Sequence, residues 1–170
     1  FSETGLIPTK LAGLNSIYIK TLSDKTIKEC LYNNQFSLAE NILILNNFIN
    51  NSKYIGHTVL SYQESLQPLI MWYRQLWGES LGKHGKGTHL IPAIGSIDQH
   101  SQLQMWLDGP DNLFFTIIVP KKRKIDYKLI DIKGFLPFYL NKKKLGDVLS
   151  TMAIATYKQL VKAGKPVRVI

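Results

Sequence analysis

Apolar residues recur along this chain with two alternating periods, one typical of helices and one typical of strands. Spacings of three and four residues predict helices over 16–32, 37–49, 96–109 and 145–166. The same spacing predicts a helix that begins at a cap at Ser65 and runs towards Gly82. Shorter β-prone runs predict strands over 53–62, 88–94, 112–120 and 167–170. The run 112–120 is apolar throughout, which indicates a central strand buried on both faces.

The helix over 37–49 carries the clearest local signals. Ser37 and Glu40 have the spacing of a capping box, in which each side chain bonds to the backbone N–H of the other residue. Asn50 and Asn51 follow the last apolar position and end the helix. Its apolar positions predict a stripe facing the core, formed by Ile42, Leu43, Leu45 and Phe48.

Strands that alternate with helices of this length predict parallel βαβ units, and hence an α/β fold: a three-layer αβα sandwich with a mainly parallel sheet. A length of 170 residues fits one domain over 1–170. In open sheets of this kind, ligands bind at the carboxyl ends of the strands and the amino ends of the helices. No apolar run reaches the roughly 18 residues of a membrane span, so we expect no membrane partner.

The composition favours a cytoplasmic protein with an anionic ligand. A single cysteine, Cys30, forms no internal disulfide and reads as a buried or half-buried thiol. The net charge of +9 suits phosphorylated metabolites, nucleic acid or lipid surfaces. The basic runs "KKRK" (121–124) and "KKK" (142–144) also fit solvated turns, and no aromatic stacking motif interleaves with them. We therefore expect no nucleic-acid partner, while nucleic-acid binding through these runs stays as a third hypothesis.

Candidate chemistry is concentrated in "WGESLGKHGKGTHLIPAIGSIDQHSQLQ" (77–104), which holds Glu79 and three of the four histidines. By pattern alone, Glu79 is a helix-end glutamate, and His100 is a surface residue or a core residue bonded to the backbone. His57, His84 and His89 could suggest a metal, but no carboxylate or cysteine completes a tetrahedral set at the usual spacing. We therefore expect no metal site, and we expect Trp72 and Trp77 to anchor the core.

Three segments carry a resemblance to a known family. "WYRQLWGESLGK" (72–83) contains Glu-Ser-x-Gly-Lys, "SIDQHSQLQ" (96–104) contains a histidine 21 residues after that glutamate, and "FSETGLIPTKLAGLN" (1–15) opens the chain. In this order, they resemble the glucose-6-phosphate isomerase family in its shorter bacterial form. Leu81 stands where many members have Asn, which removes one polar contact.

The resemblance implies a domain of a larger enzyme. It identifies 1–170 as the second sugar-isomerase domain, truncated at both ends: the family's signature arginine and first sugar-isomerase domain would precede Phe1, and its catalytic lysine would follow Ile170. The parent enzyme would interconvert glucose 6-phosphate and fructose 6-phosphate as a homodimer without a cofactor. We expect the isolated chain to have little or no activity. The alternative is a non-catalytic sugar-phosphate-binding domain of the type found in regulators.

The resemblance also implies a role for three residues. Glu79 would be the base that moves a proton between C2 and C1, partly desolvated by Leu76 and Trp77 near the end of its helix. His100, expected at the N-terminal end of the next helix, would open the sugar ring and would reach the site of the other subunit. Gln75, on the same helix face as Glu79, would contact the sugar.

Overall fold

The computed structural model of the chain describes residues 2–32, 36–120, 126–131 and 134–170, with side chains at all of these except 30, 31 and 36–39. The side chains of Ser37, expected in a capping box, and of Cys30 lie outside the described part of the structure, and so does the basic run 121–124. The residues group into two compact units, Phe1–Asn47 and Phe48–Ile170. Each unit is described by itself.

The first unit is helical. It contains α1 (Glu3–Leu11), α2 (Ser16–Tyr32) and the larger part of α3 (Phe36–Asn50). The two helices expected over 16–32 and 37–49 are confirmed, whereas α1 was not predicted. The expected core-facing stripe of α3 is wrong for Ile42 and Leu43, which are 57% and 63% exposed.

The second unit is built on a parallel sheet. Its strands are β1 (Gly56–Ser61), β2 (His89–Ile94), β3 (Leu113–Ile118) and β4 (Val167–Val169), in the order β2-β1-β3-β4. Every neighbouring pair is parallel, as the alternation of strands and helices predicts. All six residues of β1 are buried, because this strand has a neighbour on each side and helices on both faces.

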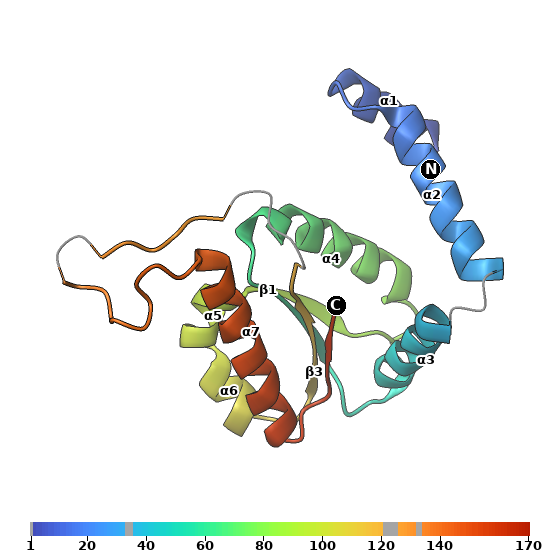
Figure 1. Ribbon diagram of the computed structural model, residues 1–170. Coiled ribbons are helices and arrows are strands. Elements are labelled where there is room, and N and C mark those ends of the chain that lie inside the picture. The colour runs from blue at the N-terminus through green and yellow to red at the C-terminus, as the bar shows by residue number, and fades with distance from the viewer. Residues whose placement is uncertain (1, 33–35, 121–125, 132–133) are drawn as a thin grey trace. The chain divides into compact units, whose positions relative to one another are not determined.

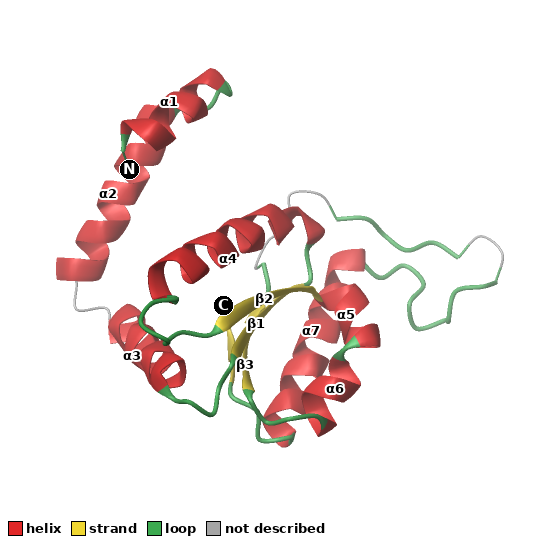
Figure 2. Cartoon of the chain, turned by 180° about the vertical axis from the view of Figure 1, so that it is seen from behind, coloured by secondary structure: helices red, strands yellow, loops and turns green. Residues whose placement is uncertain are grey.

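Helices cover the two faces of the sheet, so the expected three-layer sandwich is confirmed. One face carries α4 (Gln67–Leu81), which follows the short 3₁₀ turn η1 (Glu64–Leu66). The opposite face carries α5 (Gly95–Ser101), α6 (Leu103–Asp108) and α7 (Leu145–Lys162), as Figures 1 and 2 show. The same division appears in the core, where His57 packs against Trp77 of α4, and Phe115 packs against Trp106 of α6.

The helix expected over 96–109 is divided. Gln102 adopts φ −118° and ψ −19°, which separates α5 from α6, and Gly109 ends α6 as predicted. The expected caps Ser96 and Asp98 lie inside α5, which already begins at Gly95. The Tyr62 ring packs so closely on Gly95 that it leaves no room for a side chain there. A Cβ at Gly95 would lie 2.4 Å from the Tyr62 ring. Asp98 still helps to start the helix, since its carboxylate accepts a hydrogen bond of 2.7 Å from the backbone N–H of Ile94.

All four strands run in the same direction, so their amino ends lie together at one end of the sheet and their carboxyl ends at the other. We call these two ends the amino edge and the carboxyl edge. Each helix runs back antiparallel to the strand before it, so its N-terminal end lies at the carboxyl edge of the sheet and its C-terminal end at the amino edge. The chain leaves β1 towards one side of the sheet and β3 towards the other. The carboxyl ends of these two strands therefore form the switch point at which such sheets bind ligands.

Candidate functional site

Glu79 and Gln75 lie together on α4, close to its C-terminal end. Both side chains are exposed, and the Gln75 amide donates a hydrogen bond of 3.1 Å from Nε2 to Glu79 Oε1. A separation of four residues brings two side chains onto the same face of a helix. The expected pairing of these two candidate residues is confirmed, and the Gln75 amide fixes one oxygen of the carboxylate.

The expected partial desolvation of Glu79 is wrong in this single chain. Trp77 points into the core, where it is 5% exposed and donates from Nε1 to the carbonyl oxygen of Thr88 at 2.9 Å. Leu76 is itself 39% exposed. Neither residue shields Glu79 from water, so any desolvation of this carboxylate has to come from another part of the protein or from another chain.

The glycine-rich loop after α4 holds Glu79 at the amino edge of the sheet. Residues 82–88 lead directly into β2, and His84, Gly85 and Gly87 all have positive φ. A Cβ at Gly87 would lie 2.8 Å from the carbonyl oxygen of Leu81, so the chain turns back closely on the end of α4. These glycines therefore serve the tight return of the chain from α4 to β2.

His100 lies on the other face of the sheet from Glu79. It is exposed in the last turn of α5, the helix that begins immediately after the carboxyl end of β2. The expectation that it sits at the N-terminal end of its helix is wrong, because α5 starts at Gly95 and ends one residue after His100. The positive end of the helix dipole, which we expected to act on His100, therefore does not lie beside this side chain.

The structure does not bring Glu79 and His100 together within one chain. Glu79 lies on α4, which covers one face of the sheet, and His100 lies on α5, which covers the opposite face. The sheet therefore lies between the two helices. A single sugar ring cannot contact both side chains in one chain, so a shared site requires Glu79 from one chain and His100 from another.

Trp72 is a feature of this site that the sequence analysis missed. We expected a core anchor, but its side chain is 54% exposed. It shares a helix face with four other exposed residues, and we call this set the outer face of α4: Leu69, Trp72, Gln75, Leu76 and Glu79. Helical spacing could have revealed it, because Trp72 lies on the opposite side of the helix from Ile70 and Trp77, which are both buried.

An open pocket of about 640 Å³ occupies the carboxyl edge of the sheet. It lies where open α/β sheets bind ligands, and its size suits a sugar-sized molecule. Neither Glu79 nor His100 lines it. The pocket is lined by the segment after β1 (Tyr62–Ser65), by Ser96, by Asp126 and Tyr127, and by Leu145, Gly146 and Leu149 of α7.

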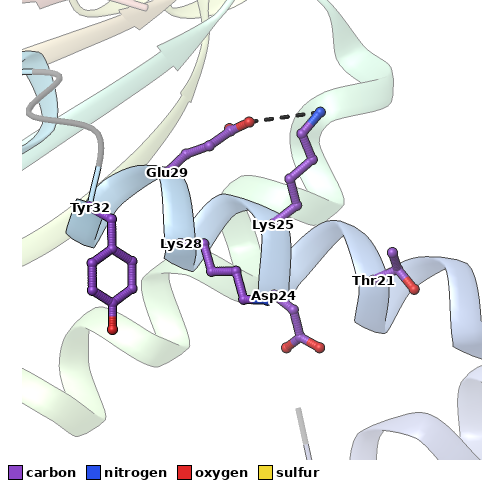
Figure 3. Close-up of a pocket in the computed structure, with 6 residues that line it drawn as sticks. All are labelled: Thr21, Asp24, Lys25, Lys28, Glu29 and Tyr32. Atoms are coloured by element: carbon purple, nitrogen blue, oxygen red, sulfur yellow. Dashed lines mark ion pairs between the residues drawn. The ribbon is translucent and has the colours of Figure 1, made fainter.

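A second hollow lies on α2 and forms no site. Figure 3 shows the six side chains that line it, and all of them belong to this one helix. They include the ion pair between Lys25 Nζ and Glu29 Oε1, 3.7 Å apart and exposed to solvent. An exposed pair of this kind, four residues apart on a helix, contributes about 0.3–0.5 kcal/mol to helix stability.

His57 is buried in the sheet and has a structural role. It is 0% exposed, stacks on Phe114 with ring centroids 4.4 Å apart, and places Nε2 2.8 Å from Thr116 Oγ1. Arg168 in turn donates from Nε to Thr116 Oγ1 at 2.9 Å. Burial, and then the charge of Arg168, lowers the pKa of His57 from 6.5 to about 3.

This lowered pKa predicts a loss of stability in acid. Below pH 6.5 the unfolded chain takes up a proton at His57 that the folded chain refuses down to about pH 3. The free energy of unfolding therefore falls by about 1.4 kcal/mol per pH unit over this window, or about 2 kcal/mol between pH 7 and pH 5. Urea denaturation at both pH values measures the effect. In His57→Phe this part of the pH dependence is lost, whereas in His84→Asn, which changes an exposed histidine, it is retained.

Two further findings concern metals and membranes. Among the described residues, no three His, Cys, Asp or Glu side chains lie close enough together to hold a metal ion. Likewise, no helix in the described part of the chain is both long and apolar enough to cross a membrane.

Comparisons with known proteins give the family. No protein-family model matches the chain. It is 30% identical over 170 residues to glucose-6-phosphate isomerase of Rubrobacter xylanophilus, an alignment that covers 97% of this chain and 39% of the relative. It is 35% identical over 162 residues to a probable glucose-6-phosphate isomerase of Methanococcus maripaludis, which covers 91% of this chain and 35% of the relative.

A solved structure agrees with these relatives. The crystal structure of a hypothetical protein from Thermus thermophilus superimposes with a TM-score of 0.84 and 30% sequence identity. It covers 99% of this chain and 41% of that chain. The chain thus spans less than half the length of the relatives it matches, and it belongs to the glucose-6-phosphate isomerase family.

Proposed function

We propose that the protein containing this chain interconverts glucose 6-phosphate and fructose 6-phosphate by ring opening followed by proton transfer through an enediol. The observation that carries the proposal is the pair formed by Gln75 and Glu79, exposed together at the end of α4 in the segment that resembles the family's catalytic motif. The names of the relatives support the same reaction.

In this mechanism, Glu79 takes a proton from C2 of the open-chain aldose and returns it to C1. A carboxylate suits this step because it is compact enough to reach two adjacent carbons and strong enough as a base once water is excluded. The hydrogen bond from Gln75 holds the carboxylate in a fixed orientation and leaves its second oxygen free to face the substrate. Gln75 is also placed to contact the sugar hydroxyls when the ligand is bound.

His100 would open the sugar ring from a second chain. Protonation of the ring oxygen, together with deprotonation of the anomeric hydroxyl, needs a group that titrates near neutral pH, as histidine does. Because Glu79 and His100 lie on helices that cover opposite faces of the sheet, we propose a homodimer in which each site takes Glu79 from one chain and His100 from its partner. No metal or organic cofactor takes part in the proposed reaction.

Turnover of the complete gene product and of the isolated chain 1–170 tests this proposal. Glucose 6-phosphate formed from fructose 6-phosphate is followed through NADPH production by a coupling dehydrogenase. We expect turnover by the complete product and none above background by residues 1–170, because the family's phosphate-binding groups and catalytic lysine would lie outside this chain. Absence of turnover in the complete product would contradict the proposed reaction, and robust turnover by 1–170 alone would contradict the proposed division of the site.

A further inference from the structure

The C-terminal end of α4, which carries Glu79, is attached to the sheet through one buried side chain. Within α4, which is described throughout, the buried residues are Ile70 near its start and Trp77 near its end. The turn that follows Trp77 runs from Gly78 to Leu81 and buries none of its residues. Trp77 is therefore the buried residue of this helix closest to Glu79, from which it is two residues away.

Trp77 makes two kinds of contact in the core. Its indole Nε1 donates to the carbonyl oxygen of Thr88 at 2.9 Å and, more weakly, to Thr88 Oγ1 at 3.3 Å. Its ring packs against the rings of His57 and Tyr73, with centroids 4.8 Å and 5.5 Å apart. Trp77 and Thr88 are only 5% and 9% exposed, so little water competes for the hydrogen bond between them.

The acceptor of this hydrogen bond is itself fixed to the sheet. Thr88 directly precedes β2, and the backbone N–H of His89 donates to the carbonyl oxygen of Ile55 at 2.9 Å. His89 also pairs with Gly56 in the register of β1 and β2. The bond from Trp77 to Thr88 therefore connects the last turn of α4 to the first residues of two paired strands.

The last turn of α4 depends on this connection because the helix is weak there. Gly78 stands between Trp77 and Glu79, and glycine within a helix is less favourable than alanine. A Cβ at Gly78 would meet no atom within 4 Å, and its φ is not positive, so neither packing nor backbone conformation requires glycine. The hydrogen bond from Gln75 joins two residues of the same helix, so it orients the Glu79 carboxylate but does not fix the helix end to the sheet.

We propose that Trp77 is a positioning residue for Glu79, and that its hydrogen bond to Thr88 sets the distance between the Glu79 carboxylate and the substrate carbons. The proposal rests on the proposed function, in which Glu79 moves a proton between C2 and C1. Trp77 points into the core and would not touch the substrate. Because misplacement of a reacting group by about 1 Å can lower a rate about a hundredfold, loss of this hydrogen bond should act on the chemical step.

Trp77→Phe in the complete gene product tests the proposal, because phenylalanine keeps a ring in the core but lacks the N–H. We expect kcat for fructose 6-phosphate to fall on the order of thirtyfold, with KM little changed. Adding Gly78→Ala stabilises the last turn and should recover about fivefold of this loss. The matched control is Ile70→Val, which shortens the other buried side chain of α4 and should lower the thermal midpoint while kcat stays within about twofold.

A double-mutant cycle distinguishes positioning of Glu79 from a general loosening of the fold. If Trp77 acts through the Glu79 carboxylate, Trp77→Phe has no further effect on the residual turnover of Glu79→Gln. An unchanged kcat in Trp77→Phe, or equal losses in the wild-type and Glu79→Gln backgrounds, would overturn the proposal. If Trp77→Phe alone does not fold, Gly78→Ala is compared with Trp77→Phe/Gly78→Ala, and equal kcat values in this pair would overturn it as well.

Hydrogen exchange of the backbone amides of residues 79–82 separates failure of this inference from failure of the proposed function. We expect exchange at these amides to accelerate on the order of tenfold in Trp77→Phe and to stay unchanged in Ile70→Val. Accelerated exchange in a protein that has no isomerase activity would contradict the proposed function alone. An active enzyme in which Glu79→Gln lowers kcat but Trp77→Phe does not would contradict this inference alone.

Discussion

Replacing Glu79 with glutamine lowers kcat for fructose 6-phosphate by on the order of a thousandfold in the complete gene product. Glutamine keeps the size of the side chain and can still bond to Gln75, whose amide now donates to Glu79 Oε1 at 3.1 Å. It cannot take up the proton that has to move between C2 and C1. Since substrate contacts are preserved, KM changes little, and the loss falls on kcat in the coupled assay.

Two further variants sharpen this result. Glu79→Asp keeps a base but withdraws it by one methylene, so we expect an intermediate loss, on the order of a hundredfold, because proton transfer depends steeply on distance. Glu29→Gln alters an exposed glutamate on α2 and should leave kcat within about twofold. Unchanged turnover in Glu79→Gln would remove the base assignment and favour a non-catalytic sugar-phosphate-binding domain.

The sandwich could be predicted from the sequence because its strands and helices differ sharply in length and period. The buried strand β3 is a short, mostly apolar run, and Gly109 and Gly164 follow the ends of the helices α6 and α7. The division between α5 and α6 could not be predicted, since the apolar spacing continues through Gln102 and only the tertiary packing sets its backbone angles. The helix α1 escaped prediction because it is short and contains Gly5 and Pro8, two residue types that disfavour a helix interior.

The site was predicted less well than the fold, for a physical reason. Helical periodicity correctly paired Gln75 with Glu79, because that relation is local to α4. The placement of His100 against Glu79 depends on topology. The helices α4 and α5 cover opposite faces of the sheet, because the connection from β1 to β2 and the connection from β2 to β3 cross the sheet in opposite directions. The sequence pattern does not reveal the order of the strands, so this separation could not be predicted.

Exposure was also misjudged at apolar positions, because periodicity shows which residues share a face but not what covers that face. Trp72 and Trp77 are both large and aromatic, yet Trp77 enters the core and Trp72 stands on the outer face of α4. Phe135 and Phe138 are also large and aromatic, and both are exposed in the connection between β3 and α7. Apolar residues that the fold of one chain leaves exposed mark the surfaces at which another chain can pack.

Mixing two inactive variants restores activity if the site is shared between subunits. Glu79→Gln lacks the base, and His100→Ala lacks the ring-opening group, so each homodimer has two defective sites. In a heterodimer of the two, one site carries both changes, and the other combines the unaltered Glu79 of one chain with the unaltered His100 of its partner. Statistical exchange makes half of the dimers mixed, so turnover should recover to about a quarter of the wild-type value.

The size of this recovery distinguishes a site shared between two subunits from a site formed within one chain. The two substitutions are distributed differently over the sites of the mixed dimer in these two cases. If Glu79 and His100 acted within one chain, every site in the mixed dimer would keep one defect, and turnover would stay at the mean of the two variants. The measurement is the coupled assay before and after subunit exchange in mild denaturant, with a tagged variant to show by co-purification that mixed dimers have formed. Mixed dimers without recovered turnover would contradict a site shared between subunits. Because Glu79 and His100 lie on opposite faces of the sheet in one chain, that outcome would exclude one of them from the site.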